Sequence, residues 1–127
     1  MRNFKDLLVW EKGHRLTLEL YKVTRAFPKE ELYGLTSQIR RAAASVGANL
    51  AEGCGRRSEG EFGRFLLIAM GSASELAYHL LLAHDLGFIK DAEYVRLDAN
   101  LAEVRRMLTS LTLKVKSAAG TDGETES

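Results

Sequence analysis

The sequence predicts an all-α protein that folds as an up-and-down antiparallel four-helix bundle. Apolar residues recur at alternating spacings of three and four along several segments, which is the period of a helix with one buried face. The chain has a single proline, whereas a β-rich or irregular domain of 127 residues normally carries more of them in its turns. The connections between the periodic segments are short, so consecutive helices should be antiparallel neighbours.

The first predicted helix ends at Pro28, which cannot continue a helix. Its apolar positions alternate in steps of four and three, the pattern of helices that cross at about 20°. These positions are Val9, Gly13, Leu16, Leu20, Val23 and Phe27.

The second predicted helix runs from about Leu35 to Cys54 and is rich in small residues. Its apolar stripe consists of Leu35, Ile39, Ala42, Val46 and Leu50. Small residues crowd around this stripe, namely Ala43, Ala44, Gly47, Ala48 and Ala51. Because small side chains let neighbouring helices approach closely, this helix should be central or lie at an interface.

The third and fourth helices repeat the cadence of the first. The third carries Phe62, Leu66, Ala69, Ala73, Leu76, Leu80 and Ala83, and the fourth carries Leu97, Leu101, Val104, Leu108, Leu111 and Val115. Ser58 and Glu61 predict a capping box at the start of the third helix, and Gly53 and Gly55 predict the end of the second. Gly87 should close the third helix in the left-handed conformation, and Asp91 should cap the fourth.

Composition and charge divide the chain into a bundle domain, residues 1–116, and a tail, residues 117–127. The tail is polar, contains glycine and carries three acidic residues without a base, which predicts a disordered acidic segment. The whole chain has a net charge of +1, and without the tail 18 basic residues face 17 − 3 = 14 acidic ones, or +4. This mild excess permits a nucleic-acid partner without requiring one.

The single cysteine and the short apolar runs indicate a cytoplasmic protein. Cys54 cannot form an intrachain disulfide or contribute to a cysteine-rich zinc site, so a reducing compartment fits best. The longest apolar run, Phe65 to Met70, is far below the roughly 20 residues of a membrane span. The N-terminal residues are not followed by the apolar stretch of a signal peptide, so we expect neither export nor a membrane partner.

Motifs for catalysis are incomplete, and we therefore expect no enzyme, no metal and no cofactor. A di-iron bundle needs two Glu-x-x-His pairs, but only Glu11 and His14 have this spacing, since Glu75 and His79 are four apart. The glycines from residue 53 to residue 60 lack the preceding strand and the Gly-Lys-Ser/Thr ending of a nucleotide loop. Cys54 has no base beside it in the sequence. No small-molecule substrate is evident.

The most distinctive polar pattern is a stripe along the second helix beside its apolar face. It comprises Gln38, Arg41, Ser45, Asn49 and Glu52, which fall within an arc of about 80° at about 100° per residue. Antiparallel pairing through a turn near Arg57 places Arg41 opposite Ser72 and Glu75 on the third helix. The stripe, which we call the polar seam together with Ser72 and Glu75, is either a hydrogen-bonded network between helices or a surface for a partner subunit.

Arginines outside this seam form the best candidate for a nucleic-acid site. Arg40 lies about 100° around the helix from Arg41 and points away from the core. Together with Arg56, Arg57 and Arg64 it could form a basic patch, because guanidinium groups match phosphate oxygens. The alternative is an ordinary solvated surface. The bases near the end of the fourth helix, Arg105, Arg106, Lys114 and Lys116, suit the negative end of its dipole.

Several segments resemble the four-helix-bundle proteins encoded in 23S rRNA intervening sequences. The strongest are residues 38–46 (QIRRAAASV), 49–53 (NLAEG) and 65–76 (FLLIAMGSASEL). Val9-Trp10, Phe27-Pro28 and residues 31–35 (ELYGL) agree with the same family. The resemblance covers about residues 4–116 and leaves out only the tail.

This bacterial family is similar to the accessory variability protein of diversity-generating retroelements, a ring-shaped homopentamer with a basic surface that binds the reverse transcriptase and nucleic acid. The resemblance implies a homo-oligomer, most simply a pentamer, and a non-enzymatic protein associated with rRNA or another nucleic acid. A protein-protein adaptor or scaffold without nucleic-acid binding is the alternative. A metal-dependent oxidase is a third hypothesis, from a different class.

Overall fold

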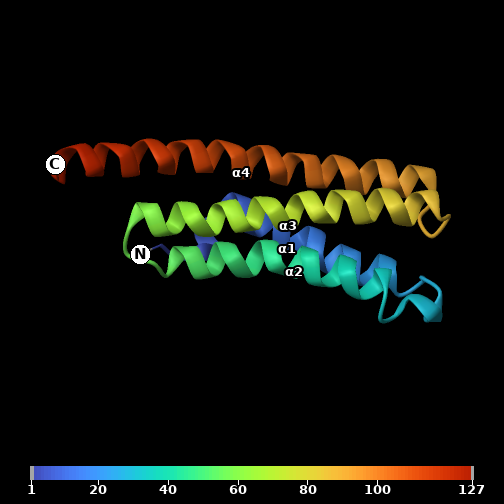
Figure 1. Cartoon of the computed structure of the whole chain (residues 1–127). Coiled ribbons are helices and arrows are strands. Elements are labelled where there is room, and N and C mark those ends of the chain that lie inside the picture. The colour runs from blue at the N-terminus through green and yellow to red at the C-terminus, as the bar shows by residue number, and fades with distance from the viewer. Residues whose placement is uncertain (1, 127) are drawn as a thin grey trace.

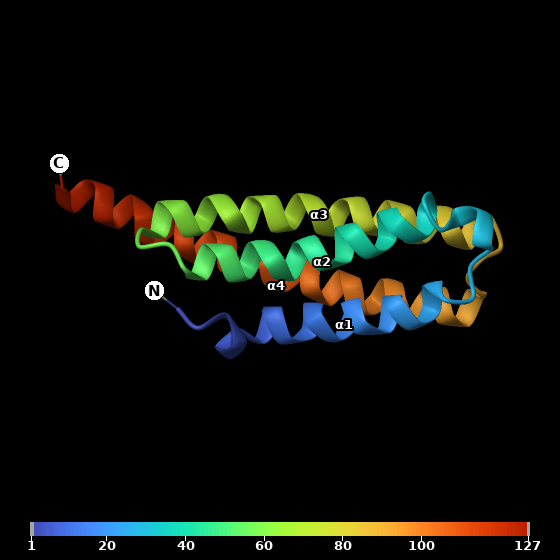
Figure 2. The ribbon, with the colours of Figure 1, turned by 90° about the horizontal axis from the view of Figure 1, so that it is seen from below.

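The computed structural model describes residues 2–126 and contains four α-helices and no strand in that range. The helices are α1 (Leu8–Thr24), α2 (Leu35–Cys54), α3 (Glu59–Asp85) and α4 (Asp91–Glu126). Two short 3₁₀ helices, η1 (Phe4–Asp6) and η2 (Lys29–Glu31), precede α1 and α2. Figures 1 and 2 show that successive helices run in opposite directions, so the predicted all-α bundle and its up-down-up-down connectivity are confirmed.

One hydrophobic core runs the length of the bundle. The large side chains with less than 2% exposure include Leu20 of α1, Ile39 of α2, Phe62 of α3 and Leu101 of α4. All the predicted stripe positions are buried except Val23 and Leu111, which are partly buried and pack against the core. The periodic pattern therefore identified the inner face of every helix.

The end of α1 differs from its predicted boundary. The helix ends at Thr24, three residues before Phe27, because the proline at position 28 disfavours helical geometry in the residue before it. Phe27 nevertheless lies in the core, 7% exposed, with its ring centroid 5.6 Å from that of Phe88. The apolar pattern therefore predicted the burial of Phe27 correctly, although this residue lies in a turn after the helix.

The ends of α3 agree largely with the predicted caps. The Ser58 hydroxyl accepts a hydrogen bond from the Glu61 backbone N–H at 3.0 Å, which is one half of a capping box. Gly87 has a φ of +83°, the left-handed conformation expected after a helix. Asp91 is instead the first residue of α4, and its carboxylate lies 2.6 Å from Nε2 of His84.

The last helix is longer than the sequence predicts. Residues 117–126, expected to be disordered, continue α4, and Figures 1 and 2 show this end projecting beyond the turn between α2 and α3. Extending a helix adds one hydrogen bond per residue without a new nucleation cost, and the segment contains no proline. The side chains from residue 120 onward lie outside the described ones.

Helix α3 has an outer face that the bundle does not cover. By length and composition alone it could span a membrane, but only 33% of its most apolar 18-residue window is buried in the structure. Core helices of soluble proteins pass the same test, and α3 packs against both α2 and α4. The unusual feature is therefore the apolar surface that remains exposed.

Candidate functional site

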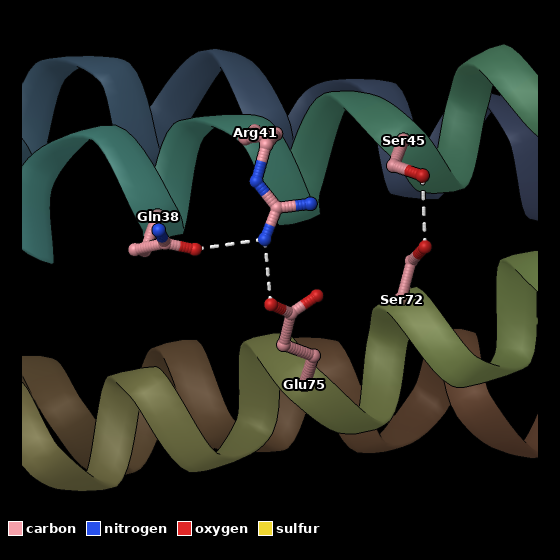
Figure 3. Close-up of polar contacts among 5 residues, drawn as sticks. All are labelled: Gln38, Arg41, Ser45, Ser72 and Glu75. Carbon is pink, nitrogen blue, oxygen red and sulfur yellow. Dashed lines mark hydrogen bonds and ion pairs between the residues drawn. The ribbon is translucent and has the colours of Figure 1, made fainter.

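The polar seam joins α2 to α3 at the predicted register. Arg41 donates through one Nη to Oε1 of Glu75 at 2.6 Å and to Oε1 of Gln38 at 2.7 Å. One helical turn further along, the hydroxyls of Ser45 and Ser72 lie 2.8 Å apart. Figure 3 shows these two contacts bridging the space between the helices side by side. These two contacts between α2 and α3, one helical turn apart, fix the register of the two helices along their axes.

Three predicted members of the seam do not bond to α3, and the first of them, Gln38, accepts from Arg41 of its own helix. Asn49 donates from Nδ2 to the backbone carbonyl of Ser45 at 2.8 Å and to its hydroxyl at 3.0 Å, within α2. Glu52 accepts a hydrogen bond from Arg56 at 2.6 Å, and Arg56 lies in the turn that follows α2 and not on α3. These residues shape the ends of the network and make no contact across it.

The ion pair of the seam lies near the surface. The Arg41 side chain is 56% exposed and that of Glu75 is 38% exposed, so their charges remain largely hydrated. An exposed ion pair contributes only about 0–1 kcal/mol to stability. The function of the seam within one chain is therefore alignment of the two helices, and the outer side of the pair is accessible to a partner.

The predicted basic patch is divided by the structure. Arg40 donates from Nε to the Thr24 hydroxyl at 2.9 Å and from Nη to the Tyr21 carbonyl at 3.2 Å. Its guanidinium carbon also lies 4.8 Å from the centre of the Tyr21 ring. Arg40 thus satisfies the C-terminal end of α1, roughly 20 Å along α2 from the end of that helix at Cys54, at a rise of about 1.5 Å per residue. It does not form one patch with the other three arginines.

The remaining arginines cluster around the α2–α3 turn. Arg56 pairs with Glu52, and the guanidinium groups of Arg56 and Arg64 lie 5.0 and 4.8 Å from the Phe65 ring centre. Arg57 is exposed, and within the described residues neither it nor Arg64 has a carboxylate at ion-pair distance. These two arginines are the part of the predicted patch that is available to a ligand.

Sequence reasoning missed two surfaces, both on α3. The first is its outer face, which exposes Leu67, Ile68, Tyr78 and Leu81 to between 41% and 59%. The second is the groove between α3 and α4, where Arg105 and Arg106 line a cavity of about 400 Å³. The lack of a carboxylate three or four residues from Arg105 was a signal in the sequence that this arginine is not paired along its helix.

Chemical groups suited to catalysis are dispersed over the described residues. Among these residues, no group of three or more His, Cys, Asp and Glu side chains is arranged so that it could hold a metal ion. Glu11 pairs with Arg15 at 2.6 Å, and the His14 ring stacks on Trp10 with centroids 4.8 Å apart. Cys54 is 1% exposed, and burial raises the pKa of its thiol, which disfavours the nucleophilic thiolate.

Comparison with known proteins places the fold and the family. A crystal structure of a protein of unknown function from the S23 ribosomal protein family of Bacteroides thetaiotaomicron superposes with a TM-score of 0.77. The match covers 83% of this chain and 95% of the other at 24% identity, a level that shows the fold alone. No curated protein matches the chain. The model of the 23S rRNA-intervening sequence proteins matches residues 5–110, most of the bundle, and the chain therefore belongs to that family.

Proposed function

We propose that this protein is a non-enzymatic assembly protein that associates with copies of itself through the outer face of α3. The observation that carries the proposal is the set of large apolar side chains exposed along that face, Leu67, Ile68, Tyr78 and Leu81. A partner that covers exposed apolar side chains stabilises the complex by about 25 cal/mol per Å² of apolar surface removed from water.

The composition of this surface fits a protein partner. Gly71 lies among the apolar residues, and a Cβ built there would have no atom within 4 Å, so another helix could approach the backbone closely. Beside it on α2, the small residues Ala44 and Ala48 are exposed, and the Arg41–Glu75 pair offers polar groups at the margin. An apolar centre with a polar margin is the usual anatomy of a protein interface.

A ring-shaped homopentamer is the assembly that we propose, by likeness to the accessory variability proteins. A ring with five members needs a heterologous contact, in which the α3 face packs on a different surface of the next copy. A two-fold dimer would instead pack the α3 face on itself. The mass of the particle distinguishes these arrangements.

Light scattering on the purified chain tests the assembly. We expect a mass near five times the 14.1 kDa of one chain, falling to the monomer mass in the double variant Ile68→Glu with Tyr78→Glu. The matched control, Leu32→Glu with Leu86→Glu, introduces the same charges on residues that are 50% and 53% exposed outside the helices. A monomeric wild-type protein would disprove self-association, and a dimer would disprove the ring.

Association with RNA is a second candidate function, favoured by the arginines around the α2–α3 turn. Arg57 and Arg64 are exposed and have no carboxylate contact within the described residues. Binding through such residues weakens steeply between low and physiological salt, because each phosphate contact releases counterions. A labelled 23S rRNA fragment should therefore be retarded at low salt and less so at physiological salt. If the fragment is not retarded at low salt, the RNA association is wrong, and the alternative, a protein-protein adaptor or scaffold that does not bind nucleic acid, is favoured.

A further inference from the structure

Two hollows lie between α3 and α4, each lined by residues of both helices. The first, of about 400 Å³, is lined by Met70, Ser74, Ala102, Arg105, Arg106 and Thr109. The second, of about 490 Å³, includes Arg64, Leu67, Leu113 and Lys116. Thr112 of the second hollow lies 3.4 Å from the Met70 sulfur of the first, so the two hollows are neighbours along the same pair of helices. We call this surface the α3–α4 groove.

The basic side chains of the α3–α4 groove are available to a ligand. Arg64, Arg105, Arg106 and Lys116 have no carboxylate within ion-pair distance in the part of the chain whose side chains are described. Arg105 makes one long hydrogen bond, 3.4 Å, to the Ser74 hydroxyl. Five other arginines, Arg2, Arg15, Arg41, Arg56 and Arg96, each pair with a glutamate.

Acidic groups are scarce in the same groove. Among the described residues that line the two hollows, Glu59 is the only one with a carboxylate. Glu59 lies 2.8 Å from a guanidinium nitrogen of Arg2, so its charge is already compensated. The described residues of the groove therefore carry an excess of positive charge, and the Ser74 hydroxyl is an additional polar group beside Arg105.

We propose that the α3–α4 groove binds the sugar–phosphate backbone of a nucleic-acid strand. The inference takes its class of ligand from the proposed RNA association, but it places the contact along α4 rather than in the predicted patch with Arg40 and Arg56. Arg105 and Lys116 are eleven residues apart, or roughly 16 Å along the helix, enough for several successive phosphates. Arginine groups with neighbouring hydroxyls suit phosphate oxygens.

The same geometry predicts little sequence preference. Asn and Gln side chains, which read base edges, are absent from the described lining of both hollows, as are the aromatic side chains on which bases stack. Contacts to phosphates alone fix position without reading sequence. RNA and DNA share this backbone, so parallel measurements with both strands decide which one the groove prefers.

Fluorescence anisotropy of short labelled RNA and DNA strands of one sequence, titrated with the full chain over a range of salt, tests the groove. Four phosphate contacts would give a slope of log K against log salt of about −0.7 × 4, or roughly −2.8. The variant Arg105→Ala with Arg106→Ala should weaken binding at low salt and make the slope shallower by about 1.4.

The control variant is Lys22→Ala with Arg25→Ala, which removes the same two charges from exposed residues at the end of α1. Its slope should equal that of the wild type, and melting curves and light scattering should show that both variants keep their fold and mass. Equal weakening by the two double variants would overturn the groove, because net charge alone would then explain binding. Equally effective competition by polyglutamate would also overturn it, in favour of an acidic protein ligand.

The two proposals fail in different ways. If neither RNA nor DNA binds at low salt, both the RNA association and the groove are wrong. If binding is lost in Arg57→Ala but unchanged in Arg105→Ala with Arg106→Ala, the RNA association stands and the groove is wrong.

Discussion

Gly53 occupies the closest approach between the end of α2 and the start of α3. A Cβ at this position would lie 2.9 Å from Cδ1 of Phe62 and 2.9 Å from Cβ of Phe65. Phe62 is fully buried, and the Cβ of Phe65 moves only with its backbone, so neither atom can give way easily. The sequence suggested that this glycine ends α2, but α2 continues through it and the next residue, and Gly55 has an ordinary φ of −79°.

We therefore predict that Gly53→Ala lowers the free energy of unfolding by about 1–3 kcal/mol, the usual cost of overpacking a core. Gly60→Ala is the matched control, because it makes the same change in an exposed part of α3 where no atom lies within 4 Å of the new Cβ. Urea denaturation followed by circular dichroism measures both variants. A stability for Gly53→Ala equal to that of Gly60→Ala would show that α2 and α3 can separate at no cost.

Arg40 shows why single residues were hard to assign from the sequence. The helical period correctly turned it away from Arg41, and the structure places it on the Thr24 hydroxyl and the Tyr21 carbonyl. Nothing in the local pattern of α2 indicates that the carbonyls at the end of α1 lie beside it. The packing of α1 against α2 decides which groups Arg40 contacts. An arginine that the sequence suggested for phosphate binding therefore forms hydrogen bonds to the end of α1 instead.

At the scale of elements, the turn between α3 and α4 is held by a histidine between two acids. Nε2 of His84 lies 2.6 Å from the Asp91 carboxylate and Nδ1 lies 3.1 Å from that of Asp85. The His84 ring also stacks on Tyr94 with centroids 4.5 Å apart. The hydrogen bond to Asp91, followed by that to Asp85, raises the pKa of His84 above its ordinary value of 6.5.

This arrangement predicts a pH-dependent stability. A raised pKa means that the folded protein holds the proton more tightly than the unfolded chain, so the contribution is complete below pH 6.5 and is lost as the pH rises through the folded pKa. The difference in melting temperature between wild type and His84→Gln should therefore shrink as the pH is raised above 6.5. A difference that stays constant over that range would show that the charge on His84 does not stabilise the turn.

The register of α2 against α3 was the element-scale feature best predicted from sequence. Short connections and the heptad-like periods place Arg41 near Glu75, and the structure joins them at 2.6 Å. The length of α4 was predicted less well, because composition alone cannot distinguish a polar loop from the polar end of a helix already nucleated by the bundle.

At the scale of the whole molecule, the sequence places an acidic segment directly after the residues of α4 that line the α3–α4 groove. Residues 117–127 carry three acids and no base, and Ala119 is among the residues that line the second hollow. Removing this segment raises the net charge from +1 to +4. Phosphate groups, which are repelled by these acidic residues, should then approach Arg64 and Lys116 more easily.

Truncation after Lys116 should consequently change the free energy of unfolding by less than about 0.5 kcal/mol and strengthen nucleic-acid binding at low salt. Denaturant titration and anisotropy measure the two effects on the same protein. A marked loss of stability, or a smaller particle in light scattering, would show instead that the end of α4 packs against the bundle or against a neighbouring copy.

The sequence by itself determined the number of helices, their inner faces and their antiparallel order, because burial of one stripe per helix leaves a period that survives in any single chain. The tertiary structure decided which polar residues remain available. Arg40 and Arg56 are engaged by neighbours, whereas Arg105 and Arg106 face an open groove. It also showed that α3 keeps a second apolar face after the core is complete. These features depend on the distances between helices, and the spacing of residues along one helix carries no information about those distances.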